Sequence, residues 1–236
     1  MRFDLDISHT IQKEIFRKLI YSPALRFSEL KPKRVESNLF MYHLKQLIKN
    51  GYVVKEGDKY SLSPSGMAHA DMLSLKDLRH RIQAKIITIL AVEREDGQWL
   101  MLERLHQPLI HAVGFPSGKM HYGEALDDSA VRELSEKCDI EGVRLELRGN
   151  VLMRFFIKDM IMSHVLGYVY YGKANKGVTN EKAMTGSRSF WANPETLHQD
   201  EFISGYWEIR ELLKKGDYFF KEFDFHDNTD FLKAKL

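Results

Sequence analysis

Cysteine is almost missing from this sequence, in which Cys138 is the single one among 236 residues. An internal disulfide is therefore excluded, as is typical of proteins from a reducing compartment. Long apolar runs are missing too, since the longest, Ile86 to Val92, is far shorter than the roughly 20 residues that span a bilayer. Residues 1–6 lack the apolar core of a signal peptide. We expect a cytoplasmic protein that has no membrane partner.

Positive charge is concentrated in the N-terminal third of the chain. Residues 1–81 contain 15 Lys and Arg but nine Asp and Glu, a balance of +6. The whole chain is +2, so the remaining residues sum to −4. This asymmetry favours a polyanionic partner for the N-terminal part. A solvated basic surface without a partner is the alternative.

Residues 1–75 carry the signals of three helices and a hairpin. Apolar residues recur at helical spacing over 11–21, residues 27–30 are long enough for one turn, and Ser37 can cap a helix that ends at Gly51. Strand patterns at 52–55 and 59–62 predict a hairpin. A further helix is expected from Pro64 towards Arg81. This order of elements is that of a winged helix-turn-helix domain.

Residues 38–53 resemble the recognition helix and first wing strand of bacterial winged-helix regulators. This resemblance implies that residues 1–75 bind duplex DNA, with the helix at 37–50 in the major groove. Paired half-sites would then favour a homodimer. The expected DNA contacts are Asn38, Met41, Tyr42, Lys45 and Lys49 on the helix and Lys55 and Lys59 on the hairpin. A domain that mediates only dimerisation or protein contacts is the alternative.

The pattern of apolar residues changes at residue 84, after a segment at 76–83 that we expect to be a linker helix. Strand patterns occur at 86–92, 99–104, 143–147, 151–157 and 162–171, and helical patterns at 126–138 and 207–215. They predict a mixed sheet flanked by helices, an α/β/α sandwich over residues 84–236. The fold class of the whole chain is therefore α+β.

The segment from Gly118 to Ile140 carries the most specific motif. Glu124 follows Gly118 after five residues, and Arg132-Glu-Leu-Ser-Glu-Lys-Cys-Asp-Ile140 begins after seven more. This pattern is similar to the Nudix box, and the four residues from Gly114 resemble the approach to it. The resemblance covers about residues 82–216. It implies cleavage of a diphosphate linked to another moiety, with Mg²⁺ or Mn²⁺ neutralising the phosphates and activating water.

The same resemblance assigns roles to individual residues. Glu133, Glu136 and the backbone carbonyl of Ser117 are the expected metal ligands. Arg132 would orient these acids, so that Glu133, Glu136 and Arg132 are the candidate catalytic residues. The candidate substrate-binding residues are Gly118, Lys119, Glu124 and Lys137. Gly118 is expected to let the loop approach the phosphates closely.

Two departures from the box weaken the metal site. Lys137 stands where the family has a glutamate, on the same helix face as Glu133, so its charge opposes metal binding and favours an ion pair. Asp139 replaces the glycine that ends the helix, and would adopt left-handed geometry at some cost. A metal could still be held by Glu133 and Glu136 with a later acid such as Glu181. The metal would then be held weakly, if at all.

For the remaining cysteine, histidine and aromatic residues, a structural role is the main interpretation. Cys138 is expected to pack rather than react, and the ten histidines show no metal-ligand spacing such as His-x-x-x-His. The loop residues His106, His111 and His121 lie ahead of the box, where they reach either substrate or solvent. The aromatic tail at 218–225 is expected to be a closing strand or a dimer surface.

We therefore predict a DNA-binding regulator whose Nudix-like domain binds a nucleoside diphosphate-linked metabolite and hydrolyses it slowly, if at all. Bacterial regulators that join the two folds in the reverse order sense metabolites such as ADP-ribose. The alternative is an active, Mg²⁺-dependent diphosphohydrolase with an accessory winged helix. A box that serves only as scaffolding is a third interpretation.

Overall fold

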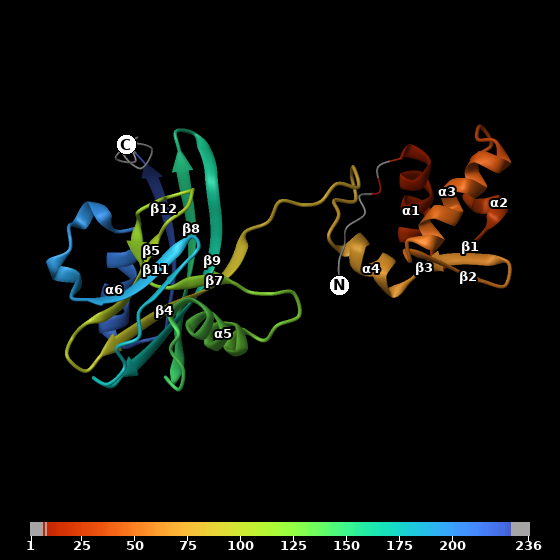
Figure 1. Cartoon of the computed structure of the whole chain (residues 1–236). Coiled ribbons are helices and arrows are strands. Elements are labelled where there is room, and N and C mark those ends of the chain that lie inside the picture. The colour runs from red at the N-terminus through yellow and green to blue at the C-terminus, as the bar shows by residue number, and fades with distance from the viewer. Residues whose placement is uncertain (1–6, 8, 228–236) are drawn as a thin grey trace. The chain divides into compact units, whose positions relative to one another are not determined.

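The chain divides into two compact units, Met1–Ile82 and Gln83–Leu236 (Figure 1). The computed structural model describes residue 7 and residues 9–227. Residues 1–6, in which the sequence lacks the core of a signal peptide, lie outside the described residues. Among the helices of the described residues, none has both the length and the apolar content that a membrane crossing requires.

The first unit packs helices against a small sheet. Its elements are α1 (Thr10–Ile20), β1 (Leu25–Arg26), α2 (Phe27–Leu30), α3 (Ser37–Lys49), β2 (Val53–Glu56), β3 (Lys59–Leu62) and α4 (Pro64–Asp71). The three strands are antiparallel in the order β1-β3-β2. Helix α3 buries Phe40, Leu44 and Leu47, three or four residues apart, against the buried face of α1. The expected order of helices followed by a hairpin is present.

The linker helix that we expected at 76–83 was a wrong prediction. Helix α4 ends at Asp71, and the chain then turns back on itself, with an antiparallel bridge between Leu73 and His80. Leu78 is buried in the first core with a positive φ of 54°, a conformation that no helix contains. The apolar residues of this segment are thus buried by a turn of the chain. Helical spacing of apolar residues does not predict such a turn.

The second unit is built on one large mixed sheet. Its elements are β4 (Lys85–Arg94), β5 (Trp99–Arg104), β6 (Val113–Gly114), β7 (Ser117–Lys119), α5 (Leu126–Cys138), β8 (Leu145–Ile157), β9 (Met160–Ala174), β10 (Lys182–Met184), β11 (Ser187–Ala192), α6 (Tyr206–Lys215) and β12 (Phe219–Asp227), with 3₁₀ turns at Pro194–Thr196 and Gln199–Glu201. The main path runs β10-β11-β5-β4-β9-β8-β12, while β6 pairs with β5 and β7 with β4. Two pairings are parallel, β4 with β9 and β8 with β12.

Alternate residues of the central strand β4 face opposite layers, which makes the unit a sandwich. Leu90 and Val92 pack in the cluster that contains α5, whereas Ile89 and Ala91 pack in the cluster that contains α6. The strands expected at 143–147 and 151–157 are a single strand, β8, with a pairing irregularity between Leu147 and Gly149. The aromatic tail forms the edge strand β12.

Candidate functional site

Strand β7 and helix α5 are pressed together at Gly118. A Cβ atom at this position would lie 1.8 Å from Cδ of Glu133, so a side chain has no room there. Gly118 pairs with Thr88 inside the sheet and does not lie in a loop. We expected this glycine to admit phosphate oxygens, but it is the Glu133 carboxylate that fills the space beside it. The glycine therefore fixes the box helix against the sheet.

Arg132 joins three acids of the box. Its Nε lies 2.6 Å from Glu124 Oε1, and its Nη1 lies 2.8 Å from Glu133 Oε1 and 3.2 Å from Glu136 Oε2. Glu124 also accepts a 2.8 Å hydrogen bond from the backbone N–H of His121, which ties the loop to the helix. The hydrogen bond from Arg132 is the main cause that lowers the pKa of Glu124 to about 2.

Lys137 reaches the remaining oxygen of Glu133. Its ammonium lies 2.9 Å from Glu133 Oε2 and donates a hydrogen bond to the carbonyl of Ser117. Glu133 is 6% exposed, and its contact with Lys137 is an ion pair, not an aligned hydrogen bond. The ammonium thus contacts two of the atoms that were expected to hold a metal ion.

The residues present do not fit a divalent cation. The third expected ligand, Glu136, pairs with Arg132, which also holds Glu133 Oε1. Glu181, the later acid that we considered, accepts a 3.3 Å hydrogen bond from the backbone of Trp191. Within the described part of the chain, no three His, Cys, Asp or Glu side chains are grouped so that they could hold a metal. A cation brought to this carboxylate would have to displace Lys137.

The end of the box helix follows the sequence-based expectations. Asp139 adopts the left-handed conformation with φ 57° and ψ 37°, in the place where the box has glycine. Cys138 is fully buried, and burial raises the pKa of its thiol to about 12. A thiol with so high a pKa stays protonated at neutral pH, so it packs as an apolar group.

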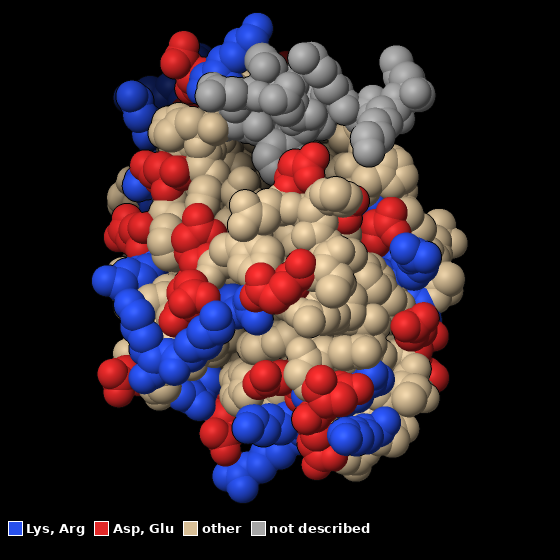
Figure 2. Space-filling model, turned by 90° about the vertical axis from the view of Figure 1, so that its left-hand side faces the viewer, with Lys and Arg blue, Asp and Glu red and all other residues tan. Residues whose placement is uncertain are grey.

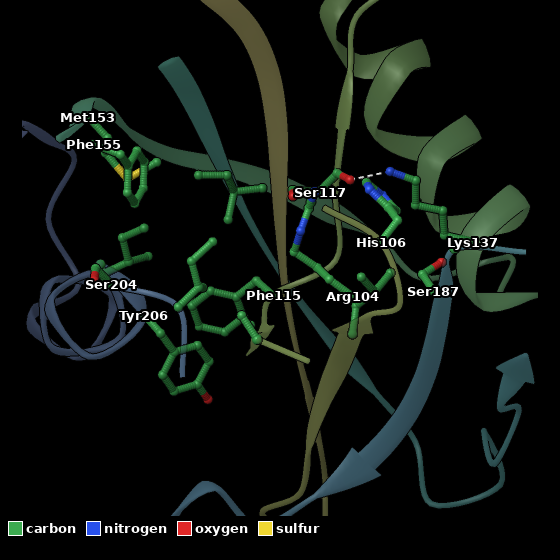
Figure 3. Close-up of a pocket in the computed structure, with 18 of the residues that line it drawn as sticks. Arg104, His106, Phe115, Ser117, Lys137, Met153, Phe155, Ser187, Ser204 and Tyr206 are labelled. Carbon is green, nitrogen blue, oxygen red and sulfur yellow. Dashed lines mark hydrogen bonds between the residues drawn. The ribbon is translucent and has the colours of Figure 1, made fainter. Parts of the chain in front are cut away.

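A cavity of about 220 Å³ opens beside the box, and the tip of Lys137 lines it (Figure 3). Arg104, Phe115 and Tyr206 line it as well, and none of these was a candidate from the sequence. They come from a strand end, the segment before the box and the start of α6, and carry no common motif. The sequence offers one clue to these cavity residues, because Phe115 lies in the segment that leads into the Gly118 motif.

The loop histidines are separated by the fold. His106 lines the cavity, whereas His111 Nδ1 lies 3.2 Å from a carboxylate oxygen of Glu103 and His121 is exposed. Lys119 is exposed on β7 and offers its carbonyl to Arg132 at 3.3 Å. Of the expected substrate-binding side chains, Lys137 is therefore the one that lines the cavity.

The expected DNA contacts lie on the surface of the first unit. Helix α3 exposes Asn38, Tyr42, Lys45 and Lys49, spaced by three or four residues along one face, and Met41 beside them is partly buried. Lys55 and Lys59 are exposed on the β2–β3 hairpin. The opposite face of α3 packs into the core, so this polar face points to solvent.

Comparison with known proteins identifies the family to which the second unit is similar. The family described as NUDIX domain matches residues 83–213, more than half of the chain. The NUDIX domain of Shewanella oneidensis NrtR, complexed with ADP ribose, has a TM-score of 0.50 at 13% identity, over 64% of this chain and 97% of that one. The MutT protein of Bacillus halodurans has a TM-score of 0.49 at 21% identity, over 62% and 92%. No curated protein sequence matches the chain.

The Glu124–Arg132 pair predicts a dependence of stability on pH. The pKa of Glu124 is about 2 in the folded chain against an ordinary value of 4.5, so its contribution is complete above about pH 4.5 and is lost as the pH falls towards 2. Urea unfolding of wild type and Glu124→Gln should differ most above pH 5 and converge near pH 2. Glu208→Gln, at an exposed position of α6, is the control. A difference that stays constant from pH 2 to 7 would contradict this account.

Proposed function

We propose that this chain, which belongs to the NUDIX domain family, is a DNA-binding regulator whose NUDIX domain binds a nucleoside diphosphate-linked metabolite without efficient turnover. The observation that carries the proposal is the position of Lys137. Its ammonium contacts Ser117 and Glu133, the atoms on which a metal-dependent diphosphatase would depend. A domain arranged in this way is suited to retain a phosphorylated ligand.

The fold of the second unit supports a ligand of the nucleoside diphosphate type. The NUDIX domain of NrtR, whose fold this chain shares, is complexed with ADP ribose. A diphosphate is strongly anionic, and the cavity beside the box presents Lys137 and Arg104 to it. These features favour a ligand of the nucleoside diphosphate type.

The DNA-binding half of the proposal rests on the first unit, as a winged helix. Support comes from the order of its helices, the three-stranded sheet β1-β3-β2 and the polar face of α3. Residues 1–81 carry the positive balance of the chain. On the face of the second unit in Figure 2, basic and acidic side chains are interspersed among the residues drawn in colour. An electrostatic footprint for DNA is thus expected on the first unit.

We also propose that the protein is a homodimer. Winged-helix proteins read paired half-sites, and a two-fold protein matches a two-fold operator. Sedimentation at micromolar concentration should give twice the monomer mass. A monomer both with and without DNA would contradict this proposal.

A second candidate function is an active diphosphatase with an accessory DNA-binding unit. It is favoured by the retention of Glu133 and Glu136 on the box helix, with the Glu136 side chain 58% exposed. The two functions differ in turnover, so hydrolysis measured for wild type and Lys137→Glu separates them.

Removal of two lysines of α3 should weaken DNA binding. Lys45→Ala combined with Lys49→Ala removes two phosphate contacts, so the slope of log K against log salt should become shallower by about 2. Binding is measured with genomic fragments across a range of salt concentrations. Lys13→Ala combined with Lys76→Ala, which lie outside α3 and the hairpin, is the matched control. If wild type shows no salt-sensitive binding to any fragment, the regulator proposal fails.

Replacement of Lys137 by glutamate should create hydrolysis. The change adds a carboxylate beside Glu133 and removes the competing ammonium, so turnover of ADP-ribose with Mg²⁺ should rise by roughly tenfold or more. Adding Glu133→Gln should abolish the gain. Lys182→Glu is the matched control, because Lys182 also lies near the helix end but donates to the carbonyl of Glu136. Brisk wild-type turnover that depends on Glu133 and does not rise in Lys137→Glu would favour the diphosphatase.

A further inference from the structure

The cavity beside the box has a cationic end and an apolar end. Arg104, His106, Ser117 and Lys137 gather on one side, and Met153, Phe155 and Tyr206 on the other, with Phe115 between them (Figure 3). Among the described residues, no Asp, Glu, Asn or Gln lines this cavity. A ligand with a negative head and an apolar or aromatic body matches both ends.

Arg104 carries a positive charge that no acid in the described part of the chain neutralises. Its guanidinium is partly buried and donates from Nε to the carbonyl of Pro108 at 3.0 Å, but it forms no ion pair with a described acid. Burial lowers the pKa of Arg104. Buried or half-buried arginines are ordinarily paired, because an isolated charge loses its hydration. An anion in the cavity would supply the missing partner.

Two further lysines add to the positive field near Arg104. The pKa of Lys85 is lowered first by partial burial and then by the charges of Lys119 and Arg104, so both of these cations repel the ammonium of Lys85. The ammonium of Lys85 donates to Ser163 Oγ at 2.8 Å, a neutral partner. Neither Lys85 nor Lys119 forms an ion pair with an acid in the described part of the chain. Such a cluster is stabilised when a multiply charged anion binds.

We infer that the cavity binds an organic phosphate directly through Arg104 and Lys137, without a divalent cation, and holds the organic group in its apolar end. The ammonium of Lys137, held by Ser117 and Glu133, supplies positive charge on the α5 side of the phosphate. Arg104 supplies it from the end of β5, with a planar fork that fits phosphate oxygens. This inference rests on the proposed function, which it deepens by naming the residues that select the ligand.

The organic group is recognised by apolar contact. Carboxylates and carboxamides, which usually read sugar hydroxyls and base edges, do not line the described cavity. The aromatic base of a nucleotide fits this end and agrees with the proposed function, and a hydrocarbon is the competing apolar group that the titration distinguishes from it. Each should bind more tightly than inorganic diphosphate alone, since burial of apolar surface adds to the phosphate contacts.

Calorimetric titration of the full chain tests this inference. The probes are ADP, isopentenyl diphosphate and inorganic diphosphate, each in EDTA and in excess Mg²⁺. We expect the affinity for the preferred organic probe to be no more than about threefold higher in Mg²⁺ than in EDTA, because the site does not use the metal. Arg104→Gln should weaken it by roughly tenfold or more, because hydrogen bonds between charged groups are lost.

Two further variants keep the test decisive. Arg188→Gln is the matched control, because Arg188 lies on the neighbouring strand and pairs with Glu103 at 3.0 Å, so its loss should leave affinity near that of wild type. Arg104→Lys keeps the charge without the fork and should show an intermediate loss. It also replaces Arg104→Gln if circular dichroism shows that the latter does not fold.

The outcomes separate this inference from the proposed function. Binding that requires Mg²⁺, or that is unchanged in both Arg104 variants, overturns the inference and leaves the regulator proposal standing. Inorganic diphosphate that binds as tightly as both organic probes also overturns the inference. If wild type binds none of the probes in either buffer, the ligand-binding half of the proposed function fails together with the inference.

Discussion

The buried carboxylate of Glu133 holds the functional region of the second unit together. One of its oxygens pairs with Arg132 and the other with Lys137. The carboxylate fits beside β7 only because residue 118 is glycine and has no side chain there. A buried charge is tolerated in a protein when it is paired in this way. Through these contacts the box helix is fastened to β7, which pairs with the central strand β4.

The same arrangement sets a competition between cations. A divalent ion and the ammonium of Lys137 would need the same oxygens, and the lysine is covalently part of the helix, so it is always present at high local concentration. Under the proposed function, Lys137 and Arg104, which line the same side of the cavity, would carry the positive charge that a diphosphatase places on its metal. Under the proposed function, this competition would favour binding of a phosphate over activation of water.

Much of the architecture followed from local patterns. The box helix begins and ends where the sequence predicted, at Leu126 and Cys138, because its apolar spacing and its residue in left-handed geometry are local properties. Local patterns also predicted the hairpin of the first unit and the long strands β4, β5, β8 and β9, but they did not predict the short strands β1, β6, β7 and β10 or the strand β11. The segment after Asp71 escaped this reasoning, because Leu73 and Leu78 reach the core through a turn that depends on neighbours outside the segment.

Residue type and spacing were enough to predict the NUDIX resemblance, the conflict posed by Lys137 and the basic character of the N-terminal unit. The atoms that Lys137 contacts, the need for glycine at position 118 and the place of Arg104 beside the same cavity follow instead from the folded structure. Those residues lie on β5, β7 and α5, and their side chains meet only after the sheet has paired. The energy of such contacts depends on burial and distance, which spacing along the chain does not specify.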